Sequence, residues 1–165
     1  MWIFFAASTQ ILGDMYAKTH EVFQACGING GGGELSRSWM ENKDTGKFIY
    51  WSKSVIPMKF HTSCEALWHL SLQPRQQEDR QDYFGVEDPD NTAAYMFRVT
   101  ASLNSGSIVS VRQQSVTRRF KERGRLIVVW RSLMKGEGMF TGILSEETGW
   151  TKLTPLVSSL DKALS

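Results

Sequence analysis

Residues 118–150 read RRFKERGRLIVVWRSLMKGEGMFTGILSEETGW, and this stretch decides the fold. Gly124 stands where a short hairpin needs a positive φ angle, so residues 107–121 and 125–134 are predicted to pair as antiparallel strands. Apolar side chains occupy both faces of the second strand, with Leu126, Val128 and Trp130 on one and Ile127, Val129 and Leu133 on the other. This pattern predicts a strand that is covered on both faces.

The residues before this stretch predict two helices and three strands. Helices are expected at residues 9–26 and 62–72, and strands at residues 47–56, 92–103 and 107–121. Thr62 and Glu65 form a capping box, in which each side chain satisfies a free backbone N–H group at the start of the second helix. The strand at residues 92–103 has two distinct faces, with Tyr95, Phe97 and Val99 on one and Met96, Arg98 and Thr100 on the other.

The remaining segments are predicted to be loops, chain ends and short elements. Residues 1–8 are an apolar N-terminal extension, and the Gly-rich residues 28–46 are expected to form a flexible loop. Residues 73–91 are polar and longer than most loops, so they are either a mobile lid or partly ordered by short turns. After the hairpin, strands are expected at residues 139–144 and 150–153, and a short helix behind Pro155.

The composition is that of one ordinary globular domain, residues 1–165, with 41% hydrophobic and 22% charged residues. A net charge of +2 is too small to favour nucleic acid as a partner. The apolar run at residues 2–7 lacks a basic flank and is far shorter than a bilayer span, so we expect at most peripheral membrane contact. Cys26 and Cys64 stand far apart and are expected to be reduced thiols. Together these features favour a cytoplasmic protein.

The sequence contains no established catalytic or cofactor-binding motif. Residues 30–33 are four glycines, but the Lys and the Ser or Thr of a phosphate-binding loop do not follow them. Hydrolase signatures are also absent, and His61, Cys64 and His69 match no zinc-binding spacing. We therefore expect no enzymatic activity, no cofactor and no metal site.

The order of elements predicts an α+β domain with helices packed on one side of a curved antiparallel sheet. Such a sheet commonly leaves an apolar cavity beneath a helix, which provides a route to ligand binding. Aromatic residues from residue 92 onward are therefore candidate cavity walls: Tyr95, Phe97, Trp130, Phe140 and Trp150. Arg98 and Arg131 either hold a lipid head group or a partner such as Glu137 inside the cavity, or extend to the surface from a sheet edge.

Several segments of the chain share residues with a known family. They are Met15-Tyr16-Ala17, Glu21-Val22-Phe23, Cys26-Gly27, Ala66-Leu67-Trp68, residues 85–92 (GVEDPDNT), Arg118-Arg119-Phe120, residues 128–133 (VVWRSL), Gly136-Glu137-Gly138, Phe140, Gly142 and residues 147–150 (ETGW). On these residues the chain resembles the START-like (steroidogenic acute regulatory related lipid-transfer) domain family, in particular its divergent members from fungus-like plant pathogens. The resemblance implies a helix-grip fold, in which an antiparallel sheet wraps a C-terminal helix around a lipid-sized tunnel. It implies no enzymatic chemistry.

Two functions follow as hypotheses. The first is non-catalytic binding of a lipid or other hydrophobic small molecule in an internal cavity, which the aromatic strands and the resemblance favour. The alternative is a protein-interaction or regulatory module that keeps the fold without a ligand, which the short predicted C-terminal helix and the Gly-rich segment favour. The expected partner is a lipid or hydrophobic small molecule in the first case and a protein in the second.

Overall fold

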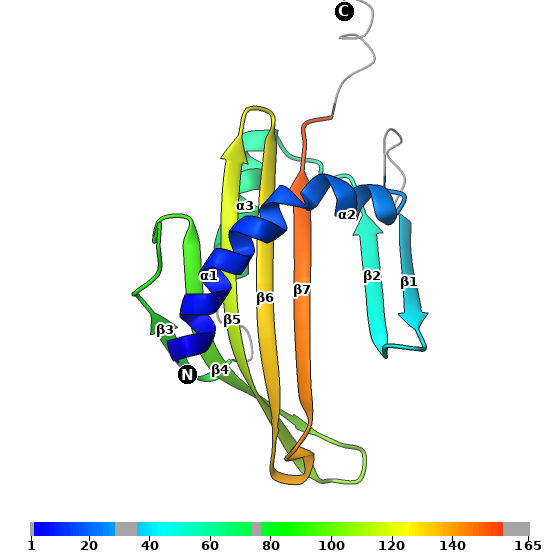
Figure 1. Cartoon of the computed structure of the whole chain (residues 1–165), viewed down its shortest axis with the longest axis vertical. Helices are drawn as coiled ribbons and strands as arrows, with labels where there is room; N and C mark the ends of the chain where they lie inside the picture. Colours follow the sequence, from blue (N-terminus) through cyan, green and yellow to red (C-terminus); the bar gives the residue numbers. More distant parts are fainter. Residues whose placement is uncertain (1, 29–35, 74–76, 157–165) are drawn as a thin grey trace, which may run out of the picture.

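The computed structural model describes residues 2–28, 36–73 and 77–156, and it shows an α+β protein built on a long antiparallel sheet (Figure 1). The helices are α1 (Trp2–Ala17), α2 (Thr19–Ala25) and α3 (Phe60–Leu72). The strands are β1 (Ser36–Asn42), β2 (Lys47–Lys53), β3 (Glu78–Tyr83), β4 (Thr92–Ser102), β5 (Ile108–Glu122), β6 (Arg125–Glu137) and β7 (Leu144–Leu153), with a 3-10 turn η1 (Gly138–Phe140) before β7. The expected α+β class is confirmed.

The strands form two separate sheets, each with its strands in chain order. One sheet has five strands in the order β3-β4-β5-β6-β7, and the other is the hairpin of β1 and β2. All neighbouring strands are antiparallel, so tight turns join most of them. The turn between β5 and β6 pairs Glu122 with Arg125, and Gly124 adopts a φ of 78° there. The predicted hairpin is confirmed at the predicted turn.

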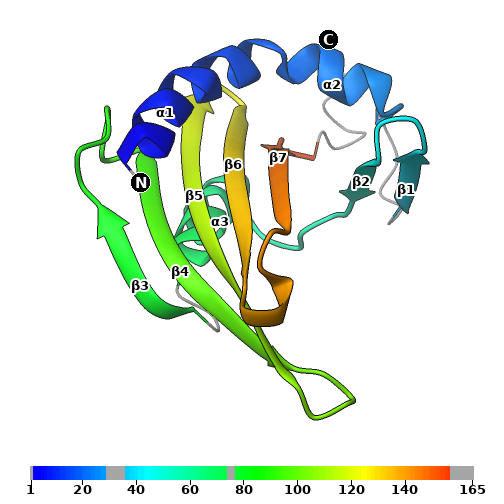
Figure 2. The ribbon, with the colours of Figure 1, turned by 60° about the horizontal axis from the view of Figure 1, so that its bottom comes forward.

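Helices cover both faces of the five-stranded sheet. Figures 1 and 2 show α1 across one face and α3 against the other. On the α1 face a buried core is formed by Phe5, Leu12, Met15, Ala94, Met96, Val116, Ile127 and Val129. On the α3 face a second core is formed by Cys64, Trp68, Leu126 and Val128. The alternation along β6 is therefore confirmed, whereas the prediction that the helices share one side of the sheet is wrong.

The first helix begins earlier than predicted. Residues 1–8 were expected to be an extension, but α1 begins at Trp2, and Phe5 and Ser8 are buried with 2% and 0% of their surfaces exposed. Phe5, Ser8, Leu12 and Met15 recur every three or four residues, so the apolar run extends the buried face of the helix. The expected single helix at residues 9–26 is divided at Lys18, after which α2 begins.

Two predicted loops contain strands. Residues 36–42, inside the expected flexible loop at residues 28–46, form β1 and pair along their whole length with β2, while residues 29–35 lie outside the described ranges. Residues 78–83, inside the polar segment at residues 73–91, form β3. Because β3 is the edge strand of its sheet, polar side chains such as Glu78 and Asp82 are compatible with strand pairing.

The remaining differences concern where elements begin and end. The helix expected from Thr62 begins at Phe60 instead, and no side-chain hydrogen bond caps it. Most of the predicted strand at residues 139–144 is absent, because Gly138 and Gly142 adopt φ angles of 58° and 93° and turn the chain through η1, and β7 begins only at Leu144. The strand predicted at residues 150–153 is present as the end of β7. The expected C-terminal helix behind Pro155 falls mostly on residues 157–165, outside the described residues.

Candidate functional site: a cleft between α3 and the sheet

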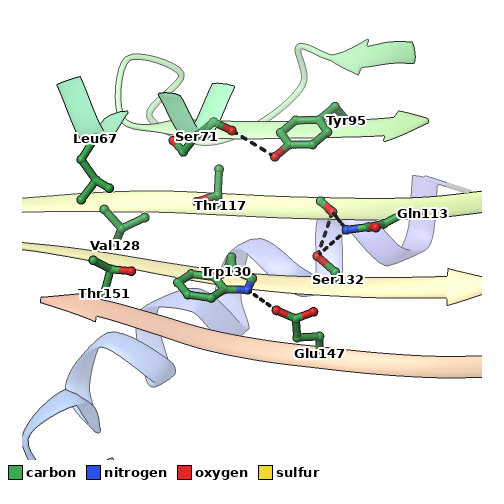
Figure 3. Close-up of a pocket in the computed structure, with 11 residues that line it drawn as sticks. Leu67, Ser71, Tyr95, Gln113, Thr117, Val128, Trp130, Ser132, Glu147 and Thr151 are labelled. Carbon is green, nitrogen blue, oxygen red and sulfur yellow. Dashed lines mark hydrogen bonds between the residues drawn. The ribbon is translucent and has the colours of Figure 1, made fainter. Parts of the chain in front are cut away.

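A half-open cleft of about 230 Å³ lies between α3 and the five-stranded sheet (Figure 3). We call it the α3 cleft. Its lining consists of Leu67, Ser71, Tyr95, Gln113, Ser115, Thr117, Val128, Trp130, Ser132, Glu147 and Thr151. Four neighbouring strands and one helix therefore contribute to a single surface.

Strand alternation places these side chains on the same face of the sheet. Ser115 of β5 lies opposite Ser132 of β6, and Thr117 lies opposite Trp130. Residues two apart on one strand share a face, so the register of the β5–β6 hairpin aligns the polar residues of both strands. On the helix, Leu67 and Ser71 are four residues apart and both line the cleft. The Leu67 side chain points toward the sheet (Figure 3), whereas the Ser71 hydroxyl donates to the backbone carbonyl of Trp68.

A cluster of three polar side chains forms the floor of the α3 cleft at one end. The hydroxyl oxygens of Ser115 and Ser132 lie 2.8 Å apart, and the Nε2 atom of Gln113 donates to both, at 3.0 and 3.3 Å. Ser115 and Ser132 are buried, with 4% and 3% of their surfaces exposed. Buried hydroxyl groups need hydrogen-bond partners, and the three side chains of this cluster act as partners for one another.

Trp130 forms one wall of the cleft and is held by β7. Its indole lies against Gly149, its partner in the strand pairing, and a Cβ atom added at Gly149 would overlap the indole ring. Its Nε1 atom donates a hydrogen bond of 3.0 Å to the Glu147 carboxylate. The absence of a side chain at Gly149 and the hydrogen bond to Glu147 together fix the orientation of the ring.

Tyr95 closes the opposite side of the cleft. Its hydroxyl donates to the backbone carbonyl of Ser71 at 3.4 Å, and the guanidinium of Arg80 lies 4.3 Å from the centre of its ring. Burial raises the pKa of the Tyr95 hydroxyl above its ordinary value of 10.0. The hydroxyl therefore stays protonated at neutral pH and acts as a hydrogen-bond donor.

Of the eight residues that the sequence suggested as cavity walls or ligand contacts, Tyr95 and Trp130 line the α3 cleft. Phe97 is on the same face as Tyr95, is buried, and has its ring centre 5.9 Å from that of Tyr95, but it does not line the cleft. Phe140 belongs to η1, beyond the end of β6, and is half-buried.

Arg98 and Glu137 contact each other on the opposite face of the sheet from the cleft. The Nε atom of Arg98 donates to a Glu137 carboxylate oxygen at 2.7 Å, and that of Arg112 donates to the other oxygen at 3.0 Å. Arg98 also pairs with Asp79. The expected pairing of Arg98 with Glu137 is therefore present, but outside the cleft.

Arg131 and Trp150 also face α1 instead of the cleft. The guanidinium of Arg131 pairs with Glu146 at 2.6 Å, contacts the buried hydroxyl of Ser8 at 3.3 Å and lies 5.2 Å from the centre of the Phe4 ring. The Nε1 atom of Trp150 donates to the backbone carbonyl of Met15 at 2.9 Å. Both residues attach α1 to the sheet.

The carboxylate of Glu137 is expected to make stability depend on acidic pH. Hydrogen bonds from Arg98 and then Arg112 lower the pKa of Glu137 from 4.5 to about 2. Because the pKa is lower in the folded state, the charged group stabilises the fold above the unfolded pKa, and this contribution is lost as the pH falls from about 4.5 to about 2. The free energy of unfolding, measured with urea, should therefore decrease less steeply across this pH range in Glu137→Gln than in the wild type.

Glu41→Gln is the control for this experiment, because Glu41 is an exposed carboxylate on the separate β1–β2 hairpin. Its stability should fall with pH as steeply as that of the wild type. Identical pH profiles for Glu137→Gln and the wild type would contradict the assigned contribution.

Comparison with protein-family models, with curated proteins and with solved structures finds no match for this chain. Among the described helices, none has the length and apolarity that crossing a bilayer requires.

Proposed function

We propose that the protein is a START-like module of the helix-grip type that binds a small amphipathic molecule, such as a lipid or a lipid fragment, in the α3 cleft without catalysing a reaction. The observation that carries this proposal is the division of the cleft into an apolar part and a hydrogen-bonding part. An amphipathic molecule matches such a surface because each of its ends finds a complementary environment.

The apolar part consists of Leu67, Val128 and the ring of Trp130, and the polar part consists of the Gln113, Ser115 and Ser132 cluster. Burial of hydrocarbon against the first group contributes roughly 25 cal/mol per Å² of apolar surface. The volume of about 230 Å³ is below the range of roughly 300–1,000 Å³ that is typical of drug-sized ligand pockets, which favours a short-chain ligand.

Binding is tested most directly by the indole N–H signals of Trp130 and Trp150 in an NMR titration with short-chain amphiphiles. Trp130 donates its N–H inside the cleft, whereas Trp150 donates to Met15 on the opposite face of the sheet. We expect a saturable shift of the Trp130 signal with a dissociation constant between about 1 µM and about 1 mM, and no shift of the Trp150 signal.

A cleft-filling substitution provides the matched control. Thr151 lines the cleft, whereas Thr148 of the same strand is exposed and lies on the opposite face of the sheet. Thr151→Trp should abolish the titration, and Thr148→Trp should leave it unchanged. If no amphiphile shifts the Trp130 signal, or if both variants still bind, the proposal is wrong.

A protein-interaction module is the second candidate, and the hairpin of β1 and β2 favours it. Trp39, Phe48 and Tyr50 lie on one face of this hairpin with exposed fractions of 68%, 70% and 67%. A cluster of exposed aromatic side chains is typical of an interaction surface, and an unpaired strand edge binds extended peptides by adding a strand. The described strands leave the outer edge of β7 unpaired, on the side of the sheet where the hairpin lies (Figures 1 and 2). An extended peptide is therefore the partner to test if the cleft binds no amphiphile.

A further inference from the structure

The polar cluster of Gln113, Ser115 and Ser132 on the cleft floor has more hydrogen-bond donors than its own acceptors can accommodate. The hydroxyls of Ser115 and Ser132 carry two protons, and only one of these can lie between their oxygens, which are 2.8 Å apart. Because the amide nitrogen of Gln113 donates to both oxygens, the second hydroxyl proton has no acceptor among the described residues. If the Gln113 amide were rotated by 180°, its oxygen would accept this proton, but its N–H groups would then have no acceptor in the cluster. In either orientation the cluster can donate to an oxygen atom of a ligand.

The charge of the cleft lining restricts what that ligand carries. Within the described part of the chain, the lining residues include one charged group, the carboxylate of Glu147, and no Lys or Arg. Glu147 accepts a hydrogen bond from Trp130 and has no ion-pair partner among the described residues. The nearby Arg80 hydrogen-bonds to Asp82, Gln77 and the carbonyl of Leu72, so these groups already occupy its guanidinium.

These two features have opposite effects on neutral and anionic ligands. A carboxylate or phosphate entering the cleft would approach the exposed carboxylate of Glu147 without a cation to offset the repulsion, which water weakens but does not remove at such short range. A neutral hydroxyl or ester group meets no such penalty. Its oxygen accepts from the Ser115, Ser132 and Gln113 cluster, and a hydroxyl proton can be donated to the second oxygen of Glu147.

We infer that the α3 cleft selects amphiphiles whose polar end is neutral and hydroxyl-bearing, such as a glycerol ester, over amphiphiles whose polar end is anionic. This inference rests on the proposed function, since it specifies the ligand of the same cleft. Trp130 supports it as a flat apolar wall, which Gly149 and Glu147 hold in place beside the two polar groups.

The inference is tested by calorimetric titration of the full chain at pH 7 with two ligands of equal chain length, 1-monooctanoylglycerol and octanoate, both below their micellar concentrations. The wild type should bind the glycerol ester about tenfold more tightly or better. Glu147→Gln retains an acceptor for the Trp130 N–H but removes the negative charge, so it should tighten octanoate binding about fivefold and narrow the preference.

Two further variants separate the charge from the hydrogen bonds. The double variant Ser115→Ala/Ser132→Ala removes the hydroxyl donors but keeps the charge of Glu147, and it should weaken binding of the glycerol ester about fivefold. Glu146→Gln is the matched control, because Glu146 precedes Glu147 in the chain but pairs with Arg131 on the opposite face. It should leave the preference between the two ligands unchanged.

The possible results distinguish this inference from the proposed function. Octanoate binding as tight as that of the glycerol ester would overturn the inference while leaving the proposed function standing. Binding of neither ligand would overturn the proposed function and the inference with it. An unchanged preference in Glu147→Gln would overturn the role assigned to the Glu147 charge.

Discussion

Replacing Ile127 by Ala should lower the free energy of unfolding by about 2–5 kcal/mol, measured by urea denaturation. The Ile127 side chain is fully buried, with 0% of its surface exposed, in the core between β6 and α1. Removing three carbon atoms there loses apolar burial and leaves a cavity that the neighbouring strands cannot fill. Leu126→Ala should have a similar cost, because Leu126 is 1% exposed in the other core, against α3.

Ile108→Ala is the matched control for these two variants. It makes the same chemical change as Ile127→Ala, but Ile108 is 71% exposed at the start of β5. Its effect should stay within about 0.5 kcal/mol. A large loss for Ile127→Ala together with a small one for Leu126→Ala would contradict the conclusion that β6 is buried on both faces.

The sequence predicted the centre of the sheet because local signals there agree with one another. Gly124 determines the turn, and the apolar residues on both faces of β6 require cover on each side. The prediction was less successful where tertiary contacts override composition. The acidic strand β3 has no apolar alternation, and it exists because β4 offers a partner for its backbone. The position of α3 on the face opposite α1 likewise depends on packing that no local pattern encodes.

The candidate site was predicted only in part, because the face of the sheet on which a side chain lies depends on how neighbouring strands are aligned. Tyr95 and Trp130 were found because they are aromatic residues on the predicted strands, whereas Trp150 has the same character but faces α1. Its face follows from the β6–β7 register, which the turn at η1 sets. The hydroxyl pair had a usable signal: counting back from the turn at Gly124 places Ser115 opposite Ser132. Serine residues on a strand are usually exposed, so this signal was missed.

Replacing Gly149 by Ala should lower the free energy of unfolding by about 1–3 kcal/mol, although the same change usually stabilises a strand or helix. The reason is steric, because the new methyl group would occupy space that the Trp130 indole fills. Gly13→Ala in α1 is the control. A Cβ atom at Gly13 would meet nothing within 4 Å, so this helix-interior change should raise stability by about 0.5–1 kcal/mol.

A double-mutant cycle shows whether Trp130 is the cause. In a Trp130→Ala background the cost of Gly149→Ala should fall by about 1 kcal/mol or more, because the obstructing ring is gone. In the single variant Gly149→Ala the ring must move away from β7 and lose its 3.0 Å hydrogen bond to Glu147, so the Trp130 indole N–H signal should shift in the NMR spectrum while that of Trp150 does not. An equal cost of Gly149→Ala in both backgrounds would mean that the indole does not lie against Gly149. The α3 cleft would then lack the fixed wall on which the proposed ligand site depends.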